Sequence, residues 1–415
     1  MVKKDNIIVG LDIGTSKICC IIGTCTADNE VEIIGFGIHP SYGLRKGVVV
    51  NIESTVESIK QAVQEAELMA GVNVDSVYVG IAGGHIRGIN SRGVIAVSGK
   101  NREITEMDVE RAIEAAKAVV MPADREILHV LPQEFIIDNQ DGIKKPLGLY
   151  GVRLEVHVHI VTGAVTSAQN IIRSVNRAGI EVKDIVLEQI ASSEATVTQE
   201  EKDLGIVVVD IGGGTTDIAT YIEGSICHSS VISLGGDHFT KDISIGLRTP
   251  YPEAEEIKVK FGCALSSMIN EDEIIEVPSV GGRKPRAISR QILAEIIEPR
   301  AEELLELIAR DIRESGSEEF IPGGVVLTGG ASLMEGMIEV GEQIFDLPAR
   351  IGYPIKIGGL KDAVNSPAYS TGVGLLLFGA SALAQNKRGH FKRSLRGGKF
   401  SSVLERMKEW FNEHF

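Results

Sequence analysis

LGIVVVDIGGGTTDIATYI, residues 204–222, is the stretch that decides the fold of this 415-residue chain. A β-branched run ends at Asp210, a turn of glycines and threonines follows, and a second β-branched run begins at Asp217. Such residues favour strands, and consecutive glycines permit unusual backbone angles, so the pattern predicts two strands joined by a tight turn. A shorter copy, IIVGLDIGTSKICCIIG at residues 7–23, carries Asp12 in the equivalent place. The two copies are too far apart for a solenoid repeat and suit the halves of a two-lobed protein.

Glycine-rich turns of this kind are suited to binding phosphate. Several backbone N–H groups converge on one point, and the hydroxyls of Thr15, Ser16 and Thr215 would add donors. Two such turns facing each other would hold a polyphosphate from both sides. Asp12 and Asp210 cannot bind phosphate directly, because like charges repel, but they could hold Mg²⁺ through water. DIGTSK alone also fits an ordinary hairpin turn, whereas three consecutive glycines between two aspartates have little packing value.

The rest of the chain alternates between helix and strand patterns. Apolar residues recur at helical spacing in four segments, residues 53–70, 107–120, 252–261 and 288–312. Strand patterns occur at residues 74–83 and 151–163. The second is expected to be half-buried, with His157 and His159 facing solvent and not forming half of a metal site. A third glycine-rich turn, VVLTGGASLMEGM at residues 325–337, follows a strand and opens a helix. This alternation predicts α/β domains with mixed sheets.

Composition and charge restrict the class of protein. The chain is 43% apolar and 24% charged, as in a soluble globular protein of several domains. Its 57 acidic and 42 basic residues give a net charge of -15, which argues against a nucleic-acid binder because phosphate would be repelled. Five cysteines without metal-ligand spacing indicate reduced thiols in a cytoplasmic protein. The N-terminal sequence lacks a signal-peptide pattern. The apolar run 372–384 is too short to span a bilayer, so this run is expected to be a core helix.

Four motifs occur in an order that resembles the nucleotide cleft of the actin, Hsp70 and sugar-kinase superfamily: DIGTSK (12–17), LEQIASSEA (187–195), DIGGGTTD (210–217) and VVLTGGASLMEGM (325–337). Two further segments, AEEIKVKFGCA (254–264) and VPSVGGRKPRAISRQILAEIIEPR (277–300), and the C-terminal tail make the whole chain resemble the FtsA family of bacterial cell-division proteins. The resemblance implies an α/β, actin-like ATPase fold. It has two lobes, each built on a ribonuclease-H-like mixed sheet with inserted subdomains, and the nucleotide lies in the interlobe cleft.

The resemblance also implies a division of the chain into named parts. The first lobe would contain subdomain 1A at residues 1–84, 162–190 and 365–385, and the inserted subdomain 1C at 85–161. The second lobe would contain subdomain 2A at residues 191–228 and 300–364, and subdomain 2B at 229–299. A flexible basic linker at 386–400 and an amphipathic membrane-targeting helix at 401–415 would complete the chain.

The cofactors that the resemblance implies are ATP and Mg²⁺. Matched position by position, the residues that would bind the nucleotide are Asp12, Gly14, Thr15, Ser16, Lys17, Gly212, Gly213, Gly214, Thr215, Thr216, Asp217, Glu255, Lys258, Gly329, Gly330 and Ala331. Asp12 and Asp210 would hold Mg²⁺ through water, and Asp210 and Glu188 would be the catalytic residues. Glu188 is followed by Gln189, where relatives usually have proline, which leaves the backbone there less fixed. Without the resemblance, Glu255 and Lys258 would be taken for a surface ion pair.

The C-terminal tail differs in character from the rest of the chain. Residues 386–400 contain six basic residues and no acidic ones, which predicts a solvated linker. On a helical wheel, one side of the segment 401–415 is apolar with basic residues at its edges: Val403, Leu404, Met407, Trp410, Phe411 and Phe415 with Arg406 and Lys408. Such a helix suits an anionic membrane surface, and FtsA-like proteins carry a targeting helix of this type. A helix packed on its own domain would show similar periodicity.

Partners and location follow from the resemblance as expectations. The protein would polymerise with itself at the cytoplasmic face of the inner membrane, at the division septum, and tether the tubulin homologue FtsZ there. Arg283, Arg286 and Arg300 are the candidate FtsZ contacts, because clustered basic groups could face an acidic peptide. It would help recruit other division proteins, bind no nucleic acid, and be at most a slow Mg-dependent ATPase whose ATP regulates assembly. Two alternatives stay open, a type IV pilus-assembly actin homologue and a small-molecule kinase of the same superfamily.

Overall fold

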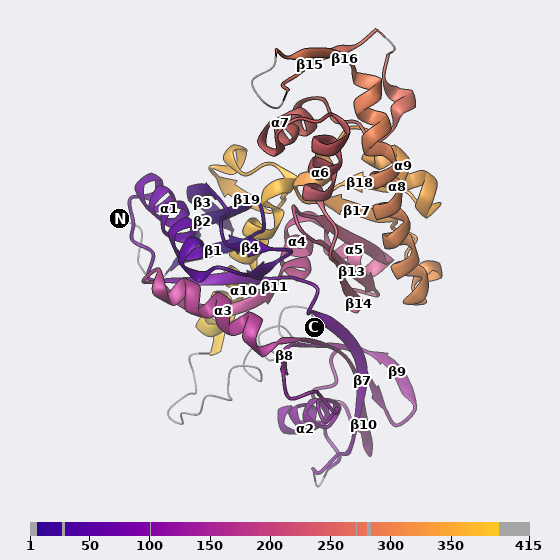
Figure 1. Cartoon of the computed structure of the whole chain (residues 1–415). Coiled ribbons are helices and arrows are strands. Elements are labelled where there is room, and N and C mark those ends of the chain that lie inside the picture. The colour runs from indigo at the N-terminus through magenta and orange to yellow at the C-terminus, as the bar shows by residue number, and fades with distance from the viewer. Residues whose placement is uncertain (1–5, 27–29, 100, 271, 280–283, 390–415) are drawn as a thin grey trace.

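Two lobes and a smaller inserted domain make up the computed structural model of this chain (Figure 1). The structure describes residues 6–26, 30–99, 101–270, 272–279 and 284–389. The first lobe includes the N-terminal segment and α10 (Ser370–Gly389), and the second lobe is formed mainly by the part of the chain from β12 (Ile206–Ile211) to β18 (Ala349–Ile351). The membrane-targeting helix predicted at 401–415, and all but the first residues of the predicted linker, lie outside the described residues.

The first lobe is built on a six-stranded sheet with the order β11-β6-β1-β2-β3-β19. Its strands are β1 (Ile7–Ile13), β2 (Lys17–Cys25), β3 (Val31–Pro40), β6 (Ser76–Ile81), β11 (Glu181–Leu187) and β19 (Ile357–Gly359). β1 pairs antiparallel with β2 and parallel with β6. The helix α1 (Ile52–Ala70) packs on β2 and β3, while α10 packs on β1, β2 and α4 (Glu188–Thr196). A short hairpin, β4 (Leu44–Arg45) and β5 (Val48–Val49), precedes α1.

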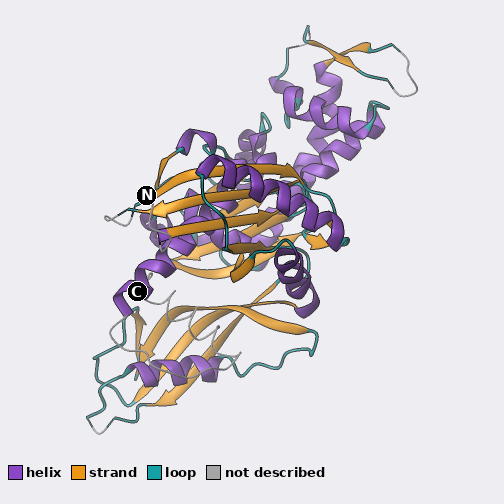
Figure 2. Cartoon of the chain, turned by 90° about the vertical axis from the view of Figure 1, so that its left-hand side faces the viewer, coloured by secondary structure: helices purple, strands orange, loops and turns teal. Residues whose placement is uncertain are grey.

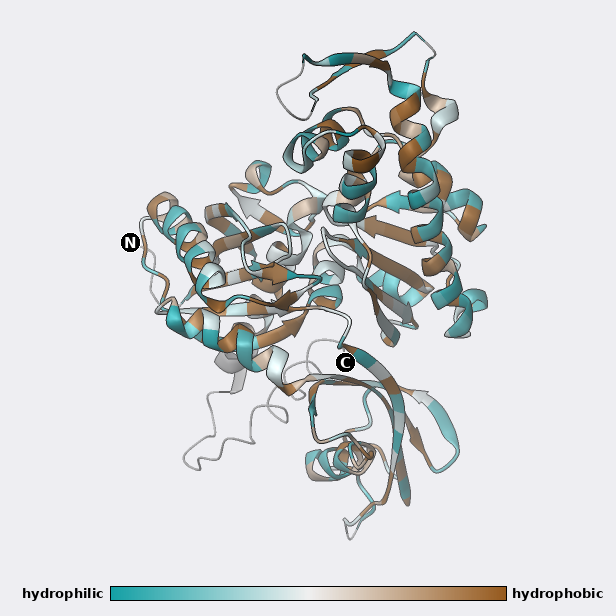
Figure 3. Cartoon of the chain, viewed as in Figure 1, coloured by the Kyte–Doolittle hydropathy of each residue, from teal (hydrophilic) through white to brown (hydrophobic). Residues whose placement is uncertain are grey.

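The second lobe repeats this topology in a five-stranded sheet with the order β14-β13-β12-β17-β18. Its strands are β12 (Ile206–Ile211), β13 (Thr216–Ile222), β14 (Ser225–Ile232), β17 (Val325–Thr328) and β18 (Ala349–Ile351). β12 pairs antiparallel with β13 and parallel with β17, as β1 does with β2 and β6. Figure 3 shows the strands of both sheets as mainly hydrophobic. The sequence repeat therefore marks a duplicated architecture, and the expected two-lobed α/β fold is confirmed.

Further elements cover the second sheet and extend the lobe away from the first. They are α5 (Gln199–Leu204), α6 (Gly236–Gly246), α7 (Tyr251–Phe261), β15 (Ile274–Val277), β16 (Arg286–Ser289), α8 (Arg290–Glu314) and α9 (Met337–Phe345). The helices predicted at 252–261 and 288–312 correspond to α7 and α8, and Pro299 lies inside α8 without ending it. β15 and β16 form an outlying hairpin, seen apart from the two sheets in Figure 2. Val277 is fully buried there, which anchors the hairpin.

The inserted domain lies between β6 and the helix α3 (Val165–Arg177). It contains a sheet of order β7-β10-β8-β9 and one helix on its face: β7 (Arg87–Ala96), α2 (Glu106–Ala116), β8 (Arg125–Ile137), β9 (Gln140–Ile143) and β10 (Arg153–Ala164). A capping box between Thr105 and Asp108 begins α2. The helix ends at Ala116, four residues before the predicted end, because its apolar face ends there and Val120 is fully exposed.

The expectation of a half-buried β10 with two solvent-facing histidines is wrong. His159 is only 1% exposed: its Nδ1 lies 2.7 Å from Asn90 Oδ1, and its Nε2 lies 2.8 Å from Ser229 Oγ in β14. His157 is partly exposed and lies between Glu134 and Glu155. The reason is that the face of the inserted sheet opposite α2 contacts the edge strand β14 of the second lobe. Burial lowers the pKa of His159 to about 3, so its ring is neutral in the folded protein.

The apolar run near the C-terminus forms a buried core helix, as expected. The expectation that this run is too short to span a bilayer is wrong by length and composition, since the segment Pro367–Ala384 is long and apolar enough, but most of it is buried inside the protein. Val373, Leu375 and Leu376 are fully buried in a cluster with residues of β1, β2 and β3. The five cysteines are free thiols, and four of them are buried.

Candidate functional site

The two glycine-rich turns lie face to face between the lobes. Each turn closes its hairpin with a backbone hydrogen bond, from Gly14 N–H to Lys17 O at 3.0 Å and from Gly212 N–H to Thr215 O at 2.9 Å. They approach so closely that a Cβ on Gly214 would lie 2.6 Å from Thr15 Oγ1. A side chain there would therefore push the turns apart, which explains why consecutive glycines are needed at this place.

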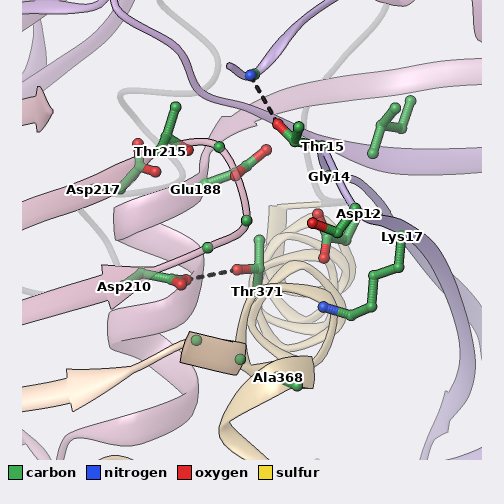
Figure 4. Close-up of a pocket in the computed structure, with 18 of the residues that line it drawn as sticks. Asp12, Gly14, Thr15, Lys17, Glu188, Asp210, Thr215, Asp217, Ala368 and Thr371 are labelled. Atoms are coloured by element: carbon green, nitrogen blue, oxygen red, sulfur yellow. Dashed lines mark hydrogen bonds between the residues drawn. The ribbon is translucent and has the colours of Figure 1, made fainter. Parts of the chain in front are cut away.

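A cleft opens between the turns, and the empty space in and just outside it, open solvent included, is about 550 Å³ (Figure 4). Fourteen of the predicted site residues line it: Asp12, Gly14, Thr15, Ser16, Lys17, Glu188, Asp210, Gly212, Gly213, Gly214, Thr215, Asp217, Gly329 and Gly330. Five residues that were not predicted also line it: Ile13, Gly47, Pro367, Ala368 and Thr371. The cleft thus gathers strand ends and turns from both lobes.

Four carboxyl groups point into the cleft region: those of Asp12, Asp210 and Asp217 are buried, and that of Glu188 is half-buried. Burial raises the pKa of Asp12 to about 6; nearby Lys17 opposes this and Asp210 adds to it. Burial also raises the pKa of Glu188 and of Asp217 well above their ordinary values, with neighbouring carboxylates adding to the effect, and raises that of Asp210. The main cause is burial, which disfavours the ionised forms, and repulsion between the carboxylates adds to it at Asp12, Glu188 and Asp217; a nearby cation would favour the ionised forms.

The carboxyl groups of the cleft suit a hydrated divalent metal ion better than one that they would ligate directly. Among the described residues, no three His, Cys, Asp or Glu side chains lie close enough together to ligate a metal directly. The buried Oδ1 of Asp217 has no hydrogen-bond partner within the described part of the chain. Unpaired carboxylate oxygens around an open space fit a hydrated Mg²⁺, which usually keeps several of its waters.

Asp210 is held by a residue that sequence reasoning missed. Thr371, in the first turn of α10, donates a hydrogen bond from Oγ1 to Asp210 Oδ2 at 2.8 Å (Figure 4). Gly47 was missed as well; its N–H donates to Thr15 Oγ1 at 3.0 Å. In the sequence, Thr371 is visible only as part of a polar pair before an apolar run, and Gly47 only as part of a Lys-Gly turn. Neither pattern indicates which distant residue it will contact.

The remaining predicted nucleotide contacts lie beside the cleft. Lys258 Nζ donates to Gly236 O at 3.1 Å and to Glu255 Oε2 at 2.6 Å, so these two residues form an ion pair at the start of α6. A Cβ on Gly236 would lie 3.4 Å from Ala331, which places that residue next to the pair. Thr216 donates its hydroxyl to Leu234 O at 2.8 Å. The third glycine turn opens a short 3₁₀ turn, and the helix α9 begins only at Met337.

The residues predicted to contact partners are placed as follows. Arg300 donates to Asp242 Oδ2 at 2.6 Å and also pairs with Glu303. Arg286 donates to the backbone oxygen of Leu247. Both guanidinium groups are therefore engaged within their own lobe. Arg283 and all the predicted membrane-contacting residues lie outside the described residues.

Comparisons with known proteins give one consistent result. The family model described as "Cell division protein FtsA" matches residues 207–374, and the model "SHS2 domain inserted in FTSA" matches residues 83–162. A protein of Pseudomonas aeruginosa named cell division protein FtsA is 51% identical over 100% of this chain and 99% of its own length. The protein of that name from Escherichia coli K12 is 42% identical over 99% of this chain and 98% of its own length.

Solved structures with low sequence identity share the fold. A type IV pilus biogenesis complex of PilM and PilN matches with a TM-score of 0.63 and 17% identity, over 90% of this chain and 98% of that one. MreB5 of Spiroplasma citri, determined with bound ADP, matches with a TM-score of 0.56 and 15% identity, over 92% of this chain and 99% of that one. At these identities the likeness establishes an actin-like fold alone.

Proposed function

Since this chain belongs to the FtsA family of cell-division proteins, we propose that it is an ATP-binding, actin-like protein that polymerises on the inner face of the cytoplasmic membrane. There it would anchor the FtsZ ring and help recruit later division proteins at the septum. The observation that carries the proposal is the cleft, in which two glycine turns from different lobes surround a cluster of buried carboxyl groups. That arrangement suits a polyphosphate with a cation.

The nucleotide would be ATP with Mg²⁺. In the proposed role, the N–H groups and hydroxyls of the two turns bind the phosphates, and Lys17 adds a positive charge. Glu255, Lys258 and the turn Gly329–Ala331 would contact the nucleoside. Mg²⁺, when bound, would neutralise phosphate charge, and Asp12 and Asp210 would hold its water shell. The raised pKa values of these carboxyl groups support a cation at this place, because a cation would favour their ionised forms.

Hydrolysis would be slow. Glu188 and Asp210 are the proposed residues that orient water, but burial and neighbouring carboxylates raise the pKa of Glu188 well above its ordinary value. A raised pKa favours the protonated form of a carboxyl group, and that form cannot accept a proton, so burial disfavours Glu188 as a general base in the nucleotide-free protein. The adjacent Gln189 is buried, and its Oε1 has no hydrogen-bond partner among the described residues. The side-chain oxygen next to Glu188 therefore adds no hydrogen bond that would fix the first turn of α4. Nucleotide would therefore act as an assembly switch.

Assembly and membrane attachment would depend on each other. One short amphipathic helix binds a bilayer only marginally, so several tails on one filament would be needed for stable attachment. Actin-like subunits joined head to tail form open filaments, because a heterologous contact does not close on itself. In this proposal, the parts predicted at 85–161 and 229–299 are inserted subdomains of the two lobes, and the basic linker lets an acidic body reach an anionic surface.

Arg283, Arg286 and Arg300 remain the proposed contacts for FtsZ. Arg300 is already paired with Asp242 and Glu303, so an acidic peptide would have to compete with these carboxylates or add to the network. Arg300→Glu is expected to weaken FtsZ binding and also to lose the Asp242 contact. Arg286→Glu would lose only a backbone contact, so it separates the effect on FtsZ from the effect on the fold.

A co-sedimentation assay with FtsZ and liposomes tests the proposal. Wild-type protein with Mg-ATP should carry FtsZ into the pellet with vesicles of phosphatidylglycerol, and less with neutral phosphatidylcholine vesicles. Deletion of residues 401–415 should leave both proteins in the supernatant. The Asp210→Ala variant should still bind the vesicles weakly through its tail, but the amount that pellets should no longer depend on ATP. Equal pelleting with and without nucleotide would sink the assembly role, and undiminished lipid binding by the deletion would remove the anchor. The relatives reported above are division proteins, so neither a pilus protein nor a small-molecule kinase is favoured.

A further inference from the structure

We propose that Thr371, in the first turn of α10, is a positioning residue that orients Asp210 and thereby sets the affinity of the cleft for Mg²⁺ with nucleotide. The inference rests on the proposed function, because it assigns a further residue to the same site. Thr371 belongs to none of the glycine turns, and it contributes a hydroxyl from the first lobe to an acid of the second.

The contact is short and buried. Thr371 Oγ1 lies 2.8 Å from Asp210 Oδ2, and the two residues are 7% and 8% exposed. The other carboxylate oxygen, Oδ1, lies so close to Gly329 that a Cβ on that glycine would collide with it. Thr371 thus donates to one oxygen of Asp210, the turn that follows β17 packs closely against the other, and the side chain of Ser192 in α4 also hydrogen-bonds to this carboxylate. Together these contacts leave the carboxylate little freedom to rotate.

The first turn of α10 contacts two residues that are paired with each other in the second sheet. Asp210 and Thr328 are register partners at the ends of the parallel strands β12 and β17. Thr371 binds Asp210, and the preceding Ser370 accepts a hydrogen bond from Thr328 Oγ1 at 2.8 Å. Two consecutive hydroxyl residues of one helix therefore contact two paired residues of the neighbouring lobe. Because α10 packs on β1 and β2, the orientation of Asp210 depends on the position of the first lobe.

The consequence concerns the metal. A carboxylate that holds a hydrated Mg²⁺ must present its free lone pairs to the waters, and a hydrogen bond from outside the shell fixes that direction. Loss of such an outer contact typically lowers metal affinity by about 10- to 100-fold. Thr371→Val removes the donor while keeping nearly the same shape, and Thr371→Ser restores the hydroxyl. Ser370→Ala is the matched control, because it removes the neighbouring interlobe contact without touching Asp210.

The test measures nucleotide binding as a function of Mg²⁺ with the full chain. A fluorescent methylanthraniloyl-ATP is titrated in EDTA and at increasing MgCl₂, and the Mg²⁺ concentration at half-effect is compared. Thr371→Val is expected to raise that concentration by about tenfold or more and to leave binding in EDTA unchanged, while Thr371→Ser and Ser370→Ala stay within about twofold of wild type. Thermal melting without nucleotide reports whether each variant is folded.

Two results overturn the inference. If Thr371→Val and Ser370→Ala weaken binding equally in EDTA and in Mg²⁺, Thr371 is only a structural contact between the lobes. If the Val variant needs no more Mg²⁺ than wild type, Asp210 is oriented without it. Should the Val variant fail to fold, Thr371→Ala is judged by the same two measurements. A wild-type protein that binds no nucleotide under any condition would instead overturn the proposed function, and this inference with it.

Discussion

Neutralising Asp12 should stabilise the nucleotide-free protein, although the same change should weaken Mg-nucleotide binding. The carboxyl group of Asp12 is 6% exposed, and burial raises its pKa from an ordinary value of 3.8 to about 6. The folded protein therefore binds the proton more tightly than the unfolded chain, and the protein loses stability as the pH rises from about 4 to about 6. At pH 7 the ionised carboxylate costs about 3 kcal/mol, since each pKa unit corresponds to about 1.4 kcal/mol.

Asp12→Asn removes this cost while keeping the size of the side chain. In denaturant or thermal melts at pH 7 without nucleotide, the variant should exceed the wild type in stability by up to about 3 kcal/mol. The difference should shrink as the pH is lowered towards 4, because the wild-type carboxyl group is then protonated too. Addition of Mg-ATP should stabilise the wild type and leave the variant nearly unchanged. A variant that is no more stable at pH 7, or a difference that does not depend on pH, would refute the reasoning from burial.

Three more outcomes are expected. Burial lowers the pKa of His159 from 6.5 to about 3, so at pH 5 the unfolded chain binds a proton that the folded protein does not, which costs about 2 kcal/mol of stability. The free energy of unfolding of His159→Gln should therefore change less between pH 7 and pH 5 than that of the wild type. Gly214→Val should abolish binding of the fluorescent nucleotide while circular dichroism stays native, since its Cβ would lie 2.6 Å from Thr15 Oγ1; retained binding would show that the turns can separate without loss. Anionic vesicles should shift the fluorescence of Trp410, the only tryptophan, to the blue, and unchanged emission would contradict an interfacial helix.

Local patterns predicted the elements that carry the fold. The β-branched runs around Asp12 and Asp210 became paired strands whose register places each aspartate at the last positions before its turn. Helical spacing located α1, α7 and α8 to within a few residues, because those helices bury a regular apolar stripe. The glycines of both turns lie in the cleft because their spacing reflects a local backbone requirement.

Contacts between distant segments could not be predicted in the same way. Thr371 follows Asp210 by more than a hundred residues, and nothing in the pattern of either segment indicates that they meet. The burial of His159 has the same origin, since Ser229 comes from a different lobe. Alternation within β10 predicted one buried apolar face, and in the structure α2 packs on that strand, but the polar face of the strand is covered by an edge strand. Sequence periodicity reports how many faces of an element are apolar, and a polar face that is buried by hydrogen bonding escapes it.

That edge strand links the inserted domain to the nucleotide cleft. β14 is an edge strand, and two of its backbone oxygens accept hydrogen bonds at 3.0 Å from side-chain amides of the inserted domain, Ile226 O from Gln133 and Cys227 O from Asn90. The same strand pairs with β13, whose first residues follow the second glycine turn. The inserted domain is covalently part of the first lobe and is hydrogen-bonded to the second. Any movement that opens the cleft must therefore either break these contacts or turn the inserted domain relative to the sheet that carries it, so its position should report whether nucleotide is bound.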